Sequence, residues 1–178
     1  PNALRSLNPA QLDGLSTQQM AALTASQVAT LTTDQVAALS TEDLNALGTA
    51  PFLRLSTAHI AALSTDQLAH LNTQHVSTLS TAQISALTTA HAHVLSTESI
   101  VALTTQQIPG LETADIMAMG THQIAAFEGA DVSVMSGAQL AAFLLATPLM
   151  LDLDGHGIQT LSAAQGVNFD LHHIGQAG

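Results

Sequence analysis

A solenoid of short α-helices, with one helix in each eight-residue repeat, is the fold that the sequence predicts. A large apolar residue returns every eight residues from Leu7 to Phe143, and a second apolar residue lies three positions before nearly every one of them. A residue that favours helix N-caps follows most members of the first set. Such an array predicts an all-α repeat domain over residues 1–147. The period stops at Leu144, so residues 148–178 are predicted to form a small irregular C-terminal loop segment.

The eight-residue period cannot belong to one continuous helix. Eight residues advance about 800° around a helix, so the Leu row would move about 80° around the axis in each repeat. No single face could bury that row, and the helix must therefore break once per repeat. A β-solenoid is the competing architecture. The two apolar positions are an odd number of residues apart and would face opposite sides of a strand, which favours the helical fold.

The repeat unit reads Leu-Ser/Thr-Thr-x-Gln-Ile/Val-Ala-Ala, and the stretch from Leu63 to Ala69 follows it with Leu68 in the place of Ile/Val. The residue after the Leu and the Gln three positions later have the spacing of a capping box. The Thr between them can also cap, so a helix of about six residues is predicted to begin at either residue. The Leu and the Ile/Val lie three apart and share the buried face. We expect the small alanines, such as Ala21 and Ala22, to let adjacent helices approach closely.

Three histidines, His59, His75 and His91, replace the Gln at the same repeat position and recur every sixteen residues. This interval hints at two octapeptides in each superhelical turn, although the sequence does not fix that number. We expect these histidines, like the Gln, to face solvent. Equivalent residues on stacked helices lie about a helix diameter (~10 Å) apart, so the three are not expected to share a metal ion.

The charge balance argues against nucleic acid as a partner. Only Arg5 and Arg54 are basic, against thirteen acidic residues, and the formal net charge is −11. Such a chain is repelled by phosphates and by anionic membranes. No stretch approaches eighteen uninterrupted apolar residues, so no membrane insertion is expected. The absence of Cys suits a secreted bacterial protein, and we expect Pro1 to lie inside a longer chain.

No catalytic motif is present in the sequence. The Ser and Thr residues serve as caps, and the acidic residues are scattered over exposed repeat positions. A Gly-rich phosphate loop, a nucleophile elbow and a metalloprotease helix are all missing. The chain is therefore predicted not to be an enzyme.

The segment after the repeats carries a turn with the spacing of a calcium loop. Asp152, Asp154 and His156 fall at positions one, three and five of an EF-hand loop, and the Ile158 carbonyl falls at position seven. The twelfth position is Ala163, where that loop has a bidentate Glu. Calcium is therefore the cofactor that this segment suggests.

The same segment resembles a module of large secreted bacterial proteins of the RTX and hemolysin-related, calcium-binding kind. The resemblance rests on Pro-Leu-x-Leu-Asp-Leu-Asp-Gly-x-Gly-Ile and a later Val-x-Phe-Asp-Leu segment, and octapeptide arrays of this type are similar to stretches of such proteins. It implies that Asp152, Asp154 and Asp170 are calcium ligands. The sequence departs from the module at His156, His172 and His173.

These observations predict a non-enzymatic structural repeat module of a large exported bacterial protein, secreted or at the cell surface. A spacer, a stalk or an adhesive surface is the expected role, with other domains of the same long chain as neighbours. Two alternatives stay open. One is a solenoid whose repeat face binds a protein or a glycan, and the other is a delivery segment of a secreted toxin.

Overall fold

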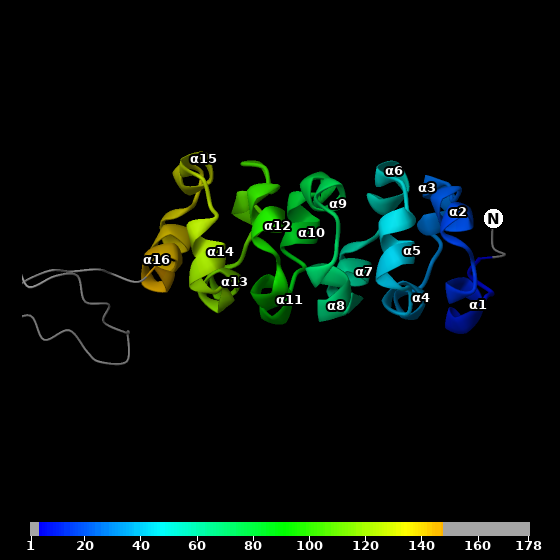
Figure 1. The fold of residues 1–178 in the computed structure, drawn as a ribbon. Helices are drawn as coiled ribbons and strands as arrows, with labels where there is room; N and C mark the ends of the chain where they lie inside the picture. Colours follow the sequence, from blue (N-terminus) through cyan, green and yellow to red (C-terminus); the bar gives the residue numbers. More distant parts are fainter. Residues whose placement is uncertain (1–3, 148–178) are drawn as a thin grey trace, which may run out of the picture.

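The computed structural model describes residues 4–147, and this part of the chain is a single series of short helices with no strand. Figure 1 shows the series as one elongated array, with α1 at one end and α16 at the other. The helices are α1 Pro9–Asp13, α2 Thr17–Ala21, α3 Ala25–Val28, α4 Thr33–Ala37, α5 Thr41–Ala46, α6 Thr49–Phe52, α7 Thr57–Ala62, α8 Thr65–Ala69, α9 Thr73–Thr78, α10 Thr81–Ile84, α11 Thr89–Val94, α12 Thr97–Val101, the 3₁₀-helix η1 Ile108–Gly110, α13 Thr113–Ala118, α14 Thr121–Ala125, α15 Gly129–Ser133 and α16 Gly137–Ala146. The predicted all-α solenoid, with one helix per octapeptide, is confirmed.

Most helices begin at the capping box that the repeat encodes, whereas α5, α9 and α12 keep only the N-cap side chain and α6 begins at Gly48 without one. In α8 the Ser64 N–H donates to Gln67 Oε1 at 2.8 Å, and the Gln67 N–H donates to Ser64 Oγ at 3.1 Å. The residue directly after the Leu is the N-cap and the following Thr is the first helical residue, which decides between the two predicted starts. The helix ends about one turn later. Leu63, which follows α7, has an extended ψ of 145°, and this directs the chain into the next cap.

Three octapeptides, or 24 residues, make one superhelical turn. Helix α1 packs on α4, α2 on α5 and α3 on α6, and the same interval continues to α9 on α12 and α10 on η1. The hint of two octapeptides per turn is therefore wrong. The spacing of His59, His75 and His91 reflects only which repeats carry a substitution, since adjacent turns meet at an interval of 24 rather than sixteen residues.

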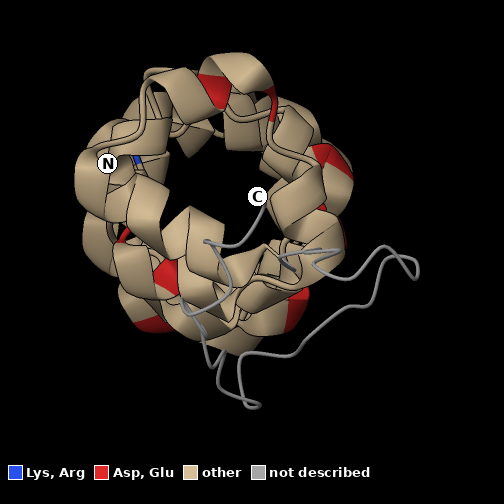
Figure 2. Ribbon diagram, turned by 90° about the vertical axis from the view of Figure 1, so that its left-hand side faces the viewer, with Lys and Arg blue, Asp and Glu red and all other residues tan. Residues whose placement is uncertain are grey.

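The apolar positions form one core along the whole array. Leu68 is 1% exposed and Leu71, three residues later, is 5% exposed. Most equivalent residues of the other repeats belong to the same buried cluster or pack against it, and Leu140 is an exposed exception. Seen along the long axis, the helices form a ring (Figure 2). Because the Leu and Ile/Val rows are buried in one cluster while the Thr and Ala rows are largely exposed, we infer that the apolar side chains fill this ring.

The alanines at the seventh position of the repeat lie mainly on the outside, whereas several at the eighth position, such as Ala46 and Ala86, pack half-buried against the core. Ala21, Ala22, Ala37 and Ala38 are all exposed, so the prediction that they let adjacent helices approach is wrong for these pairs. Where the seventh position carries a polar side chain it still reaches the next turn, since Ser85 Oγ donates to the Gly110 carbonyl at 2.9 Å. The small side chains instead cover the surface with methyl groups.

One octapeptide lacks an α-helix, and its sequence explains why. Pro109 has no N–H to donate within a helix, and the segment closes as η1 with the Gly110 N–H donating to the Gln107 carbonyl at 2.8 Å. Gly110 is buried against α10, where a Cβ at this position would lie 2.6 Å from the Thr81 carbonyl oxygen. Glycine is therefore required by close approach of two turns.

Candidate interaction surface

Each turn is tied to the turn before it by the fifth residue of the octapeptide. We call these residues the inter-turn ladder, and from the fourth repeat onward all but Pro51 are buried. They are Gln35, Asp43, His59, Gln67, His75, Gln83, His91, Ser99, Gln107, Asp115, Gln123, Asp131 and Gln139. The prediction that this position faces solvent is wrong for these residues. The position is exposed only in the first turn of the described chain, at Gln11 and Gln19.

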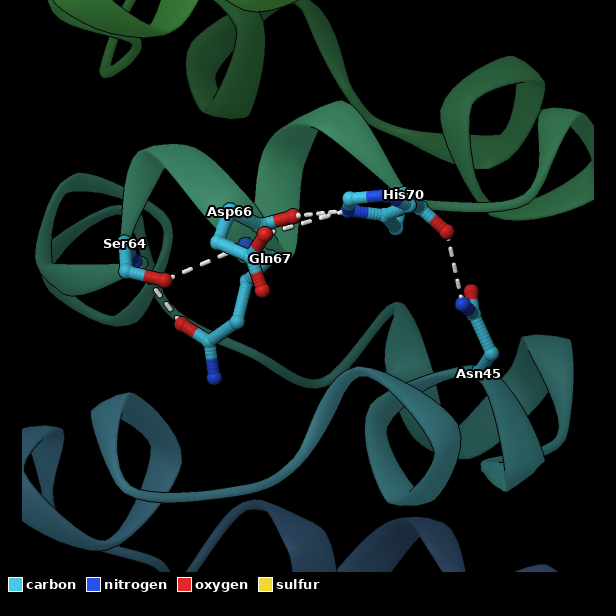
Figure 3. A network of polar contacts seen from close by, with 5 residues as sticks. All are labelled: Asn45, Ser64, Asp66, Gln67 and His70. Carbon is cyan, nitrogen blue, oxygen red and sulfur yellow. Dashed lines mark hydrogen bonds and ion pairs between the residues drawn. The ribbon is translucent and has the colours of Figure 1, made fainter.

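A ladder glutamine uses both ends of its amide. The Oε1 of Gln67 accepts the cap N–H of its own helix, as Figure 3 shows, while its Nε2 donates to the carbonyls of Val36 and Leu39 at 3.0 and 2.7 Å. Residues Gln35, Gln107, Gln123 and Gln139 make the same two inter-turn bonds, 28 and 31 residues back, and Gln83 makes the first of them.

These inter-turn bonds solve a problem that very short helices create. An α-helix leaves its last four carbonyls without a partner inside the helix, and buried carbonyls without a partner are costly. In a helix of about five residues this applies to most of the carbonyls. The amide of the next turn bonds the end of the helix below it, so one Gln caps two helices at once.

The ladder histidines reproduce both bonds of the glutamine. The Ser56 N–H donates to His59 Nδ1 at 3.0 Å, so Nδ1 carries no proton and Nε2 donates to the Leu31 carbonyl at 3.1 Å. His91 is held in the same way between the Thr88 N–H and the Leu63 carbonyl. These side chains are buried, so the prediction that they face solvent is wrong. Burial lowers the pKa of His59, although its bond to Leu31 acts in the opposite direction.

His75 differs from the other two because the N–H of its N-cap residue already has another acceptor. Its Nε2 donates to the Leu47 carbonyl at 2.8 Å, but the Asn72 N–H donates to Asn45 Oδ1 instead of to the ring. The Nδ1 atom is buried without a partner among the described residues. The ring stacks on Phe52 with centroids 4.2 Å apart, and burial lowers its pKa. This environment favours a neutral ring.

Two acidic residues at the ladder position, Asp115 and Asp131, keep the cap and lose the inter-turn donor. Asp131 accepts the Glu128 N–H at 3.1 Å, and Asp115 accepts the Glu112 N–H at 3.3 Å. A carboxylate has no N–H to offer the carbonyls of the turn below. Burial raises the pKa of Asp115, which records the cost of holding its charge at this position.

The family of the chain follows from the same octapeptide. The model of the ALTTAQ repeat matches residues 2–33, 36–73, 52–81 and 108–143, which together make up more than half of the chain. The chain belongs to the ALTTAQ repeat family. No curated protein shows a significant match to it. The family matches end before residue 148, so they do not extend to the segment that resembles the calcium-binding module.

The outer surface of the ALTTAQ array carries few charges. The acidic residues are spread around the ring rather than gathered on one side (Figure 2). Asp66 lies 3.3 Å from His70 Nδ1, and both side chains are largely exposed. The His70 carbonyl accepts from Asn45 Nδ2 of the preceding turn at 2.7 Å, so polar surface residues also connect turns (Figure 3).

A shallow groove lies between α9–α10 and the irregular repeat that holds η1. It encloses about 650 Å³ and is lined by Ser77, Thr78, Leu79, Ser80, Thr81, Thr104, Thr105, Gln106 and Gln107. Several hydroxyl donors are already used, since Thr78 donates to the His75 carbonyl and Thr81 to the Gln106 carbonyl. The groove therefore offers a partner mainly hydroxyl acceptors and the exposed side chains of Thr105 and Gln106.

The predicted calcium ligands Asp152, Asp154, Ile158 and Asp170 lie outside the described residues. Within residues 4–147 there is no group of three or more His, Asp or Glu side chains that could hold a metal ion. None of the described helices is long and apolar enough to cross a membrane. The array is a structural repeat module, and its polar chemistry serves its own turns.

The ladder is not among the predicted features, although the sequence holds a signal for it. His59, His75 and His91 stand where most repeats have Gln. Like Gln, a neutral His carries one hydrogen-bond acceptor and one donor, at similar distances from the backbone. A capping box needs only the acceptor, and Glu would supply it equally well. The use of Gln and His together therefore indicates that the second end of the side chain also has a partner.

Proposed function

We propose that this chain is a spacer that holds other domains of a large exported bacterial protein apart. The observation that supports the proposal most is the continuity of the core and of the inter-turn ladder, which join each turn of the described chain to the next. A spacer must keep a fixed distance between its two ends. The hydrogen bonds between successive turns oppose bending of the array and so help to keep that distance.

The length of such a spacer is set by the number of repeats. The 24-residue turn gives six turns in residues 4–147. Packed helices lie about 8–10 Å apart, so the described array is about 50–60 Å long and each octapeptide adds about 3 Å. Addition or loss of octapeptides changes this length in small steps without changing the packing.

A length series tests the spacer directly. Removal of residues 56–79, which form one turn, should shorten the maximum dimension in solution scattering by about 9 Å and leave the helical spectrum per residue unchanged. In the exported protein, an array of equal length with its exposed fourth and seventh positions exchanged between repeats should keep full activity. Loss of activity on this exchange would show that the surface, rather than the length, is what matters.

A binding role is the second candidate, and the hydroxyl-lined groove supports it. Its uncharged lining suits a neutral ligand such as a glycan or a polar peptide. The double variant Thr105→Ala/Gln106→Ala should weaken binding of such a ligand in calorimetry, while Ala37→Ser/Ala61→Ser on another part of the surface should not. Equal binding by both variants would remove the groove from consideration. A role in toxin delivery stays a prediction without support from the described residues.

Calcium binding by Asp152, Asp154, Ile158 and Asp170 stays a proposal based on the sequence motif. Its test is a thermal melt of the full chain in EDTA and again in millimolar Ca²⁺, because an ion that binds the folded state raises the midpoint. A midpoint that rises with Ca²⁺, and does so less in Asp152→Asn/Asp154→Asn, supports the site. Export to the cell surface or the medium, where calcium is abundant, is part of the same proposal.

A further inference from the structure

One repeat inside the array lacks the side-chain hydrogen bonds that hold the others. Helix α6 is four residues long, and its N-cap is Gly48, which has no side chain to accept from the helix. Pro51 stands at its ladder position and offers neither an acceptor for the cap N–H nor a donor for the turn below. Every other repeat within residues 8–147 has at least one side-chain hydrogen bond at the start of its helix.

Apolar packing is what keeps α6 in place. Phe52 is fully buried, and its ring stacks on His75 of the next turn. The inter-turn bond of His75 goes to the Leu47 carbonyl, which lies before α6, so it does not hold the helix itself. This repeat therefore opens once its apolar side chains leave the core, whereas the repeat of α8 must also break its cap and inter-turn bonds.

A basic residue lies in this same repeat, in a sequence that has only two of them. Arg54 is exposed just after α6, and its N–H donates to the Pro51 carbonyl at 2.9 Å. The next residue, Leu55, is 3% exposed and belongs to the core. A protease binds its substrate as an extended strand, so it cannot take up the Arg54–Leu55 bond while Leu55 and Phe52 are buried. Cleavage of this bond in the folded chain requires local opening of α6.

We propose that the Arg54–Leu55 bond is a processing site for an Arg-specific serine protease, which reaches it when α6 opens. Such proteases hold the Arg side chain in an acidic pocket and hydrolyse the bond that follows it. Water adds across the bond, so Arg54 gains a carboxylate and Leu55 an amino group. The sequence contains no Lys, and its other Arg, Arg5, precedes the first helix, so no other bond within the helical array is of this type.

Digestion of the folded full chain with trypsin tests this site. Mass spectrometry separates cleavage after Arg54 from cleavage after Arg5, and each rate is divided by that of the same chain unfolded in urea. The rate follows the population of the open form when opening and closing are fast. Gly48→Ser/Pro51→Gln supplies the N-cap hydroxyl, the cap acceptor and the inter-turn donor, and should slow the cut about tenfold or more. Ala50→Gln adds a side chain on the exposed side of the same helix and should leave the rate unchanged.

A second variant moves the Arg to a repeat that has its hydrogen bonds. Arg54→Gln/His70→Arg puts it after α8, at the same repeat position, where Leu71 follows as Leu55 follows Arg54. The bond before Leu71 should be cut at least about tenfold more slowly than the bond before Leu55 in the wild type, because α8 keeps its cap and inter-turn bonds.

Three results would overturn the proposal. One is a folded wild-type chain that trypsin does not cut after Arg54. Another is a cut that Gly48→Ser/Pro51→Gln leaves unchanged or accelerates. The third is equal cleavage at the two Arg positions, because the bond would then be exposed only by unfolding of the whole array. The spacer proposal does not depend on these results, since the length series measures the intact chain.

Discussion

Replacement of Gln67 by Glu isolates the inter-turn bond in one near-isosteric change. The carboxylate that results can still accept the Ser64 N–H, so the capping box survives. It cannot donate to the carbonyls of Val36 and Leu39, which now face Gln67 Nε2 at 3.0 and 2.7 Å. The side chain is 3% exposed, so water cannot take over these contacts without opening the turn.

The expected destabilisation is large for a change of one atom type. Each lost hydrogen bond costs about 1 kcal/mol, and a buried carboxylate beside two carbonyl oxygens adds a few kcal/mol more. We therefore expect a loss of about 3–5 kcal/mol in the free energy of unfolding. For a chain of this size, that loss lowers the melting midpoint by roughly 8–15 °C.

The first turn supplies a matched control. Gln19→Glu makes the same substitution at the same repeat position, where the side chain is exposed and its Nε2 has no carbonyl partner among the described residues. Its melting midpoint should change by no more than about 1–2 °C at a concentration where the chain is monomeric. Equal midpoints for Gln67→Glu and Gln19→Glu in chemical and thermal unfolding would refute the inter-turn role of the ladder.

Three further predictions follow from the close contacts and the buried titratable groups. Gly110→Ala should cost about 1–3 kcal/mol because its Cβ would meet the Thr81 carbonyl at 2.6 Å, while Gly129→Ala, with open space around it, should be neutral or slightly stabilising in the same urea titration. Burial lowers the pKa of His59 and His75 below the ordinary value of 6.5, so the unfolded chain binds more protons below that pH. The stability from the neutral rings is complete above pH 6.5 and falls as the pH drops below it, and the melting midpoint between pH 7.5 and 5 should fall less in His59→Gln/His75→Gln. Burial raises the pKa of Asp115 above 3.8, so its charge opposes folding above that pH, and Asp115→Asn should raise the midpoint at pH 7 and lose this advantage near pH 3.

The sequence was sufficient for the helices because their signals are local. The cap, the Gln three residues later and the apolar pair all act within one octapeptide, and helices such as α8 form where the pattern places them. The number of octapeptides per turn is a long-range property. It depends on which carbonyl Gln67 reaches, 28 residues back, and nothing within one repeat encodes that choice.

The errors about exposure have the same physical origin. A polar side chain in a short amphipathic helix is expected in solvent unless a buried partner is known. Gln67 and His59 are buried because the helix below leaves carbonyls that need donors, and that need arises only once the turns are stacked. The outward position of alanines such as Ala37 and Ala61 follows too, since the buried side of each octapeptide is already filled by Leu, Ile/Val and Gln.

The measurement that tests the 24-residue turn most directly is cross-linking of paired cysteines in this cysteine-free chain. Ala37, Ala61 and Ala21 are exposed and occupy the same repeat position. With a 24-residue turn, Ala37→Cys/Ala61→Cys places the two thiols on stacked helices about 10 Å apart, and a short bifunctional reagent should join them efficiently. Ala21→Cys/Ala37→Cys, sixteen residues apart, should react poorly because the two residues lie on different sides of the ring. Efficient cross-linking of the sixteen-residue pair, with little of the 24-residue pair, would contradict this architecture.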